Sequence, residues 1–212
     1  MAMDLTFDMA KKNPIFRDRW VLTRLQPPRG EFLHREKQKN ALILELAPLL
    51  SNQRASNLFV YGLQGTGKTA LLTHLSEQLH DQAQKDAIHL KTAYVNCAQA
   101  KTDTLILSAM LRQVGASLKN HRSGVNRSQV LRDFLQVLRD ETLNLLIVLD
   151  EIDQVLKHSG DDILYLLSRF QDDVQVKANL CTVIISNDVK VPSYLQPRTH
   201  SSFGRTKIVF PR

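Results

Sequence analysis

Short runs of apolar residues alternate along the chain with longer segments in which apolar residues recur every three or four positions. The runs have few polar interruptions, which is typical of strands that are covered on both faces of a sheet. They fall at residues 57–61, 92–96, 145–149, 182–186 and 207–210. Because helical segments separate them, the pattern predicts an α/β fold with a five-stranded, mostly parallel sheet and helices on both faces.

Several of the intervening segments carry an apolar face at helical spacing, and we expect these faces to pack on the sheet. One helix is predicted to begin near Arg35, and another to span residues 69–79. The apolar faces consist of Leu42, Leu46, Leu49 and Leu50 in the first, Leu71, Leu75 and Leu79 in the second, and Val130, Leu131, Phe134, Leu135 and Leu138 in a third.

The segment before the first helix has a different character. It is rich in Lys and Arg, and Pro14, Pro27, Pro28 and Gly30 favour extended or turning chain. We therefore expect a basic arm, residues 1–34, followed by a single domain, residues 35–212. The whole chain has 28 Lys and Arg against 21 Asp and Glu, a net charge of +7. This excess points to a polyanionic partner, and a solvated arm is the alternative interpretation of the basic residues before the first helix.

Other features argue against a membrane, export or disulfide role. No apolar stretch approaches the ~20 residues that cross a bilayer, and Asp4 and Asp8 lie where a secretory signal would be basic and then apolar. We expect a cytoplasmic, nucleoid-associated protein with no membrane partner. Cys97 and Cys181 each lie at the end of an apolar run, which indicates buried core residues rather than a disulfide or metal pair.

A phosphate-binding loop is indicated by residues 62–69, which match the pattern G-x-x-x-x-G-K-T. A predicted strand enters the loop and a predicted helix leaves it, as this motif requires. Its glycines allow backbone N–H groups to point inward, and the helix N-terminus adds partial positive charge. We expect Lys68 to reach the β- and γ-phosphates of ATP or ADP and the Thr69 hydroxyl to bind Mg²⁺. A glycine-rich turn that matches by chance is the alternative.

The nucleotide-binding residues predicted at this loop are Gly62, Gln64, Gly65, Thr66, Gly67, Lys68, Thr69 and Ala70.

An acidic pair, Asp150 and Glu151, follows the apolar run 145–149. In phosphoryl-transfer enzymes an acid at this place holds the metal. We expect Asp150 to hold Mg²⁺ and Glu151 to orient the water that attacks the γ-phosphate. An exposed helix start with Asp150 as N-cap is the alternative, and the matched phosphate loop favours the catalytic interpretation.

A third polar residue, Asn187, follows the run 182–186. Taken alone it is a turn residue. Because ligands bind beyond the carboxyl ends of parallel strands, we expect its amide to hydrogen-bond the γ-phosphate or the attacking water.

Further stretches extend the pattern beyond a phosphate loop, and together they resemble one family. They are residues 13–18, 34–36, 62–69, 95–97, 149–153, 161–165, 185–188 and 197–202. In them the chain resembles the archaeal origin-recognition and cell-division-cycle-six type DNA replication initiators, which are AAA+ ATPases. The predicted fold is then a P-loop AAA+ base domain. Gln64 and the pair Thr199-His200 depart from the usual family residues, and neither change removes a catalytic group.

The resemblance implies roles that the residues alone do not. The arm contributes to the adenine pocket, with Val21, Leu22, His34 and Arg35 as the implied contacts. Asn187 becomes the first sensor. Arg198 becomes the arginine that reaches the nucleotide of a neighbouring subunit, where in other NTPases a supplied arginine gives ~10³ to 10⁵ in rate. Without the resemblance, Arg198 is a surface arginine after Pro197.

Family members also carry an initiator-specific helical insertion that touches DNA, and it corresponds here to residues 102–127. Its predicted apolar residues are Leu105, Leu107, Met110, Leu111 and Val114. The basic residues Lys119, Arg122 and Arg127 are candidates for neutralising DNA phosphates. A solvated basic loop is an equally good interpretation.

The family continues beyond its last strand into a helical lid and a winged-helix domain, whereas this sequence stops at Arg212. The lid and winged helix are therefore absent from it. We expect a fragment of an initiator rather than a short paralogue.

The predicted function is that of an ATP-hydrolysing initiator that recognises double-stranded origin DNA and helps to load the replicative helicase together with other initiator subunits. The bound nucleotide acts as its assembly switch. One alternative is a module that holds nucleotide and binds DNA with negligible turnover. Another is a helper ATPase of transposition or clamp loading, which should lack the stretches 161–165 and 197–202.

Overall fold

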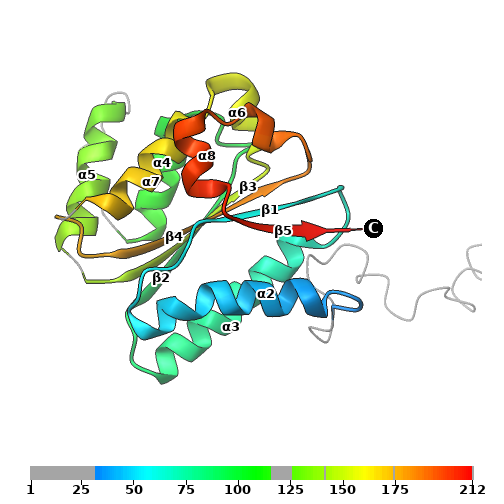
Figure 1. Cartoon of the computed structure of the whole chain (residues 1–212). Coiled ribbons are helices and arrows are strands. Elements are labelled where there is room, and N and C mark those ends of the chain that lie inside the picture. Colours follow the sequence, from blue (N-terminus) through cyan, green and yellow to red (C-terminus); the bar gives the residue numbers. More distant parts are fainter. Residues whose placement is uncertain (1–31, 116–125, 141, 174, 212) are drawn as a thin grey trace, which may run out of the picture.

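The computed structural model describes residues 32–115, 126–140, 142–173 and 175–211, and helices and strands alternate through them (Figure 1). Most of the predicted basic arm lies outside the described residues. Residues 116–125 of the predicted insertion also lie outside the described residues. Four predicted site residues, Val21, Leu22, Lys119 and Arg122, therefore have no described position.

Within the described residues the sheet has five strands, one at each predicted run. They are β1 (Leu58–Gly62), β2 (Leu90–Asn96), β3 (Asn144–Asp150), β4 (Asn179–Ser186) and β5 (Thr206–Phe210). Their order is β2-β3-β4-β1-β5, and all neighbouring strands are parallel. Because β4 lies between β1 and β3, the carboxyl ends of these three strands meet at one edge of the sheet.

Helices cover both faces of the sheet, as the sequence predicts (Figure 1). One face is covered by α2 (Glu36–Leu46), η2 (Ala47–Ser51) and α3 (Lys68–Lys85). The other is covered by α4 (Asp103–Gln113), α5 (Arg127–Asp140), α6 (Asp153–Ser159), α7 (Asp162–Asp172), η3 (Val191–Tyr194) and α8 (Pro197–Phe203).

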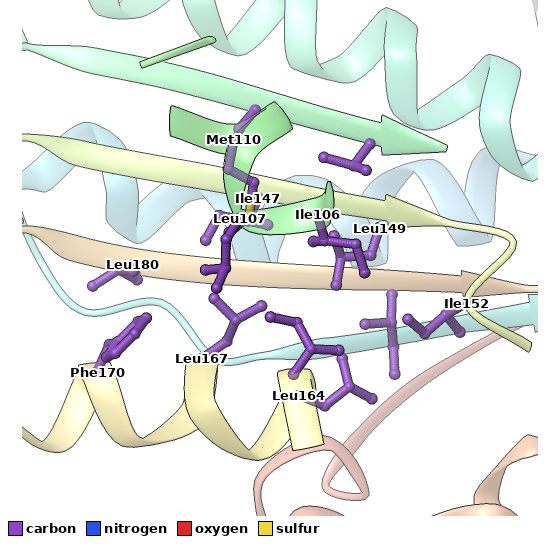
Figure 2. Packing of buried hydrophobic residues seen from close by; sticks show 14 of the residues in the cluster. Ile106, Leu107, Met110, Ile147, Leu149, Ile152, Leu164, Leu167, Phe170 and Leu180 are labelled. Carbon is purple, nitrogen blue, oxygen red and sulfur yellow. The ribbon is translucent and has the colours of Figure 1, made fainter. Parts of the chain in front are cut away.

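The core is divided by the sheet into two layers, because successive side chains of a strand point to opposite faces. Along β3, Leu145, Ile147 and Leu149 belong to the layer under α4 to α8, while Leu146 and Val148 belong to the layer under α2 and α3. Figure 2 shows Leu164, Leu167 and Phe170 of α7 pointing at the first of these layers. Burial on both faces explains why the strands are nearly uninterrupted apolar runs.

One helix differs from the predicted face. Leu105 of α4 is 50% exposed, and its neighbour Ile106 is fully buried in its place. Leu107, Met110 and Leu111 are buried as expected, so the apolar stripe is rotated toward Ile106. The first half of the predicted insertion therefore lies in the core layer over the sheet (Figure 2).

Cys97 and Cys181 are both buried and free, as the sequence predicts. Desolvation raises the pKa of each thiol to about 12, and for Cys97 the negative charge of Asp150 adds to the effect. Both thiols are therefore protonated core groups. Among the described helices, none has the length and apolar character needed to cross a membrane.

Candidate nucleotide-binding site

The loop between β1 and α3 needs glycine at several points. A Cβ on Gly62 would lie 2.3 Å from the carbonyl oxygen of Phe210 on β5, so no larger residue fits there. Gly65 (φ 78°) and Gly67 (φ 86°) are in the left-handed region, which glycine adopts without steric cost. The loop then enters α3, an 18-residue helix whose N-terminus presents free N–H groups.

Lys68 lies at the start of α3 and turns its side chain back into the loop. Its ammonium donates hydrogen bonds to the carbonyl oxygens of Gly62 and Leu63, both at 2.9 Å. The residue is only 4% exposed. Burial lowers the pKa of Lys68, and the nearby carboxylates of Asp150 and Asp153 oppose that shift. The loop thus contains a positive charge at the place where phosphate oxygens would bind.

Asp150 ends β3 next to the first turn of α3. Its Oδ2 accepts hydrogen bonds from the Thr69 hydroxyl and from the Tyr94 hydroxyl, each at 2.7 Å. Its Oδ1 accepts one from the backbone N–H of Glu151 at 2.9 Å. Asp150 is 4% exposed, and its carboxylate is fixed by groups from α3, β2 and the turn after β3. The two predicted metal-holding residues, Thr69 and Asp150, are therefore in direct contact.

These oxygen donors fit Mg²⁺, which prefers hard oxygen ligands and usually binds through one or two protein groups together with substrate phosphates and water. Within the described parts of the chain, no three His, Cys, Asp or Glu side chains gather into a metal-binding cluster. A magnesium ion here would thus be held by Thr69, Asp150 and a nucleotide rather than by an all-protein cage.

Glu151 has a left-handed backbone (φ 55°), which is uncommon for a residue with a side chain. Such conformations persist where the surrounding structure holds them, often at functional sites. The turn is held on its far side by the N–H of Ile152, which donates to the carbonyl of Ile185 on β4 at 3.0 Å. Glu151 is half-buried and follows Asp150 directly.

A buried carboxylate, Asp153, ties Asn187 to the start of α6, the helix that follows the acidic pair. Asp153, 5% exposed, accepts at Oδ1 from the Ser186 hydroxyl at 3.0 Å and from the Asn187 backbone N–H at 3.4 Å. The end of β4 is thereby tied to the start of α6. The half-buried Asn187 therefore lies at the same edge of the sheet as Asp150 and the loop.

Of the predicted adenine-side contacts, His34 and Arg35 fall within the described residues. Arg35 donates from Nε to the carbonyl of Thr66 in the loop (3.1 Å) and from a terminal nitrogen to the carbonyl of Pro211 (2.9 Å). Its guanidinium lies 5.9 Å from the ring centre of Phe210. Arg35 thus links the loop to the residue that follows β5. His34 is exposed and has a positive φ of 60°.

Arg198 lies in the first turn of α8 and contacts α7. Its guanidinium donates to Asp162 at 2.9 Å and lies 4.4 Å from the ring centre of Tyr165. The turn before α8 is fixed by the buried Asp161, whose Oδ2 accepts from the N–H of Gln196 at 2.7 Å. The two stretches that carried much of the resemblance, 161–165 and 197–202, therefore contact each other. The Arg198 side chain is 45% exposed.

Arg127, the described member of the predicted DNA-binding set, begins α5. It forms an ion pair with Asp103 of α4 at 3.0 Å, and its side chain is 50% exposed. The pair joins the two helices on either side of residues 116–125.

A cavity of about 680 Å³ opens beside Thr69, one of the two predicted metal-holding residues. One wall is a face of α3 that starts at Thr69, and the other is formed by β2, including Tyr94, and by Gln113 at the end of α4. Leu72, Leu90 and Val148 lie among its lining residues.

Sequence reasoning missed several residues that shape the site. Tyr94 in a strand is an ordinary β-former, and only its position directly before the matched stretch 95–97 hinted at more. Asp153 was part of a matched stretch, but its bond to Ser186 joins residues 33 apart in the sequence.

Comparison with known proteins gives a consistent result. A family model described as "AAA domain" matches residues 51–188. An "ORC1-type DNA replication protein 1" of Sulfurisphaera tokodaii is 34% identical over 209 residues, which cover 99% of this chain and 51% of that protein. An "ORC1-type DNA replication protein" of Pyrococcus abyssi is 34% identical over 214 residues, with coverage of 100% and 51%. The chain thus spans about half the length of these curated relatives.

Solved structures agree with the sequence comparison. The Aeropyrum pernix ORC1 protein in complex with DNA matches with a TM-score of 0.79 and 32% identity, over 92% of this chain and 49% of that one. The Aeropyrum pernix ORC2 protein in ADPNP-ADP complexes matches with a TM-score of 0.76 and 28% identity, over 92% and 52%.

Proposed function

Because the chain belongs to the AAA domain family, we propose that it binds ATP or ADP with Mg²⁺ at residues 62–69 and hydrolyses ATP to ADP and phosphate. The observation that carries the proposal is the 2.7 Å contact between the Thr69 hydroxyl and Asp150, which joins the loop after β1 to the acid at the end of β3. The buried ammonium of Lys68 is close enough for the Asp150 carboxylate to interact with it electrostatically.

The loop residues act on the phosphates through fixed positive groups. The N–H groups at the start of α3 receive the β-phosphate, and Lys68 exchanges its bonds to the carbonyls of Gly62 and Leu63 for phosphate oxygens. Thr69 and Asp150 hold Mg²⁺, which, when bound, offsets the negative charge that develops on the phosphoryl oxygens. In this proposal Gln64, Thr66 and Ala70, which belong to the same segment, also contact the nucleotide.

Glu151 orients and polarises the attacking water, and the Asn187 amide hydrogen-bonds that water or the γ-phosphate. Asp153 supports both, since it links the end of β4 to the turn that carries Glu151. Arg198 belongs to a different site. We propose that it completes the nucleotide site of a neighbouring subunit.

The test of hydrolysis is Glu151→Gln, which keeps the shape of the side chain and removes its basicity. We expect this variant to bind ATP as the unmodified chain does, while steady-state phosphate release in the presence of duplex DNA falls about a hundredfold or more. Glu45→Gln, a change of the same kind on α2, should leave the rate as it was. Unchanged turnover by Glu151→Gln would contradict the role of Glu151.

We further propose that the chain is the nucleotide-binding part of a DNA replication initiator and that it contacts double-stranded origin DNA. The names of the relatives and the DNA complex of the Aeropyrum pernix ORC1 protein support this proposal. So does the net charge of +7. The contact would form around residues 102–127, through Lys119, Arg122 and the exposed side of Arg127. Helicase loading and assembly with other initiator subunits belong to the same proposal.

Salt dependence tests the DNA contact. Each neutralised phosphate adds about 0.9 to the slope of log affinity against log salt on duplex DNA. We expect Lys119→Ala combined with Arg122→Ala to weaken duplex binding and to reduce that slope by about two, as measured by fluorescence anisotropy. A double variant with the original slope would place the contact elsewhere on the chain.

A module that holds nucleotide without turning it over is the second candidate. The engagement of Arg198 with Asp162 and Tyr165 of its own chain favours it, because an arginine held there supplies nothing to the same chain's site. Brisk phosphate release by a monomer would exclude this candidate.

A further inference from the structure

Tyr94 is placed so that its hydroxyl reaches the metal-holding carboxylate from the outer strand of the sheet. In the β2–β3 register Tyr94 pairs with Val148, two positions before Asp150. Its hydroxyl donates to Oδ2 of Asp150 at 2.7 Å, the same oxygen that the Thr69 hydroxyl contacts. The residue therefore bridges the edge of the sheet and the centre of the site.

The three groups that donate hydrogen bonds to Asp150 have different roles. The oxygen of the Thr69 hydroxyl keeps lone pairs for a metal while its O–H donates to Asp150. The Glu151 N–H belongs to the turn that carries the predicted water-orienting carboxylate. Tyr94 has no place in the proposed contacts to metal, nucleotide or water. Through its hydrogen bond the hydroxyl can fix the orientation of the Asp150 carboxylate.

The backbone of Tyr94 is itself held from outside the sheet. The Gln113 side chain at the end of α4 accepts from the N–H of Tyr94 at 2.9 Å and donates to its carbonyl at 2.8 Å. The Tyr94 residue is 37% exposed and lines the 680 Å³ cavity. A change of its hydroxyl is thus possible without opening the core.

We propose that Tyr94 is a positioning residue that acts through Asp150 and sets the affinity of the nucleotide site for Mg²⁺. This inference rests on the proposed function. Groups that hydrogen-bond a metal ligand fix its orientation, and removing them typically costs about 10- to 100-fold in metal affinity. If the hydroxyl only supported the fold, its removal would weaken nucleotide binding equally in the presence and in the absence of Mg²⁺.

The test is the Mg²⁺ dependence of binding of a fluorescent ATP analogue to Tyr94→Phe and to the unmodified chain. We expect the Mg²⁺ concentration at half-maximal binding to rise about tenfold in the variant. Binding of the same analogue in EDTA should be equal in the two proteins. Tyr194→Phe is the matched control, because Tyr194 also donates to an aspartate, Asp188, at 3.1 Å on the surface. It should leave the Mg²⁺ midpoint unchanged.

An unchanged Mg²⁺ midpoint in Tyr94→Phe overturns the inference and leaves the proposed function standing. An equal loss of binding with and without Mg²⁺ also overturns it, because it shows a general structural role. If the unmodified chain shows no Mg²⁺-dependent binding of the analogue, the proposed function fails and the inference fails with it.

Discussion

Single residues at the edge of the sheet carry most of the chemistry, and each is held by a contact from another element. Asp150 is held by Thr69 and Tyr94, and Lys68 by the carbonyls of the loop that it serves. The loop motif and the acidic pair were predictable, since their spacing is itself the signal. The bonds of Tyr94 and of Asp153 were not, because they join distant residues through the fold.

The two buried cysteines lead to a prediction about thiol reactivity. Burial raises the pKa of each thiol to about 12, whereas an unfolded thiol ionises near 9. Because the pKa of each thiol is higher in the folded state, each buried thiol contributes fully to stability below pH 9. This contribution is lost as the pH rises toward 12. At pH 8 we expect an alkylating reagent to modify neither thiol of the folded chain, and both after denaturation, as measured by intact mass. Prompt modification of the folded protein would contradict the burial of Cys97 and Cys181.

Whole elements were predicted well where burial is complete and less well where it is partial. β3 is buried along its length, so its apolar run had one interpretation. In α4 the sequence offers two adjacent leucine and isoleucine positions, and packing on the sheet selected Ile106 rather than Leu105. The helix predicted to begin near Arg35 ends at Leu46, before the last two leucines of its predicted apolar face. A 3₁₀ helix, η2, follows with Pro48 near its start, because proline cannot donate the backbone hydrogen bond that would continue α2.

The outer strand β2 depends on a side chain of α4 to cover its backbone edge. Its free backbone edge is covered at Tyr94 by the two hydrogen bonds of the Gln113 side chain. Gln113→Ala removes both, so we expect a loss of about 1 kcal/mol of stability for each bond. Hydrogen exchange at the Tyr94 amide should become faster.

Gln84→Ala serves as the control, because the Gln84 side chain hydrogen-bonds His80 of the same helix at 3.0 Å on the exposed surface of α3. It should change neither quantity. Equal exchange rates at Tyr94 in the Gln113 variant and in the unmodified chain would show that the edge is protected by something else.

The molecule as a whole places its two halves of the core on opposite sides of a fully parallel sheet, and that architecture brings the loop, the acids and Asn187 to one edge. The order of β-α units in the sequence sufficed to predict this arrangement, since parallel strands joined by helices present their carboxyl ends together. The insertion of β4 between β1 and β3 was not predictable from that order, and it sets the position of Asn187.

The central claim is that residues 62–69 form a nucleotide site whose charge comes from Lys68. Its most direct measurement is calorimetric titration of ATP with Mg²⁺ into the unmodified chain and into Lys68→Ala, with Lys85→Ala, an exposed lysine at the end of α3, as control. We predict binding by the unmodified chain and the control, and a loss of about tenfold or more in affinity in Lys68→Ala, because a hydrogen-bonded charge is removed. Equal affinity in all three proteins would contradict the account.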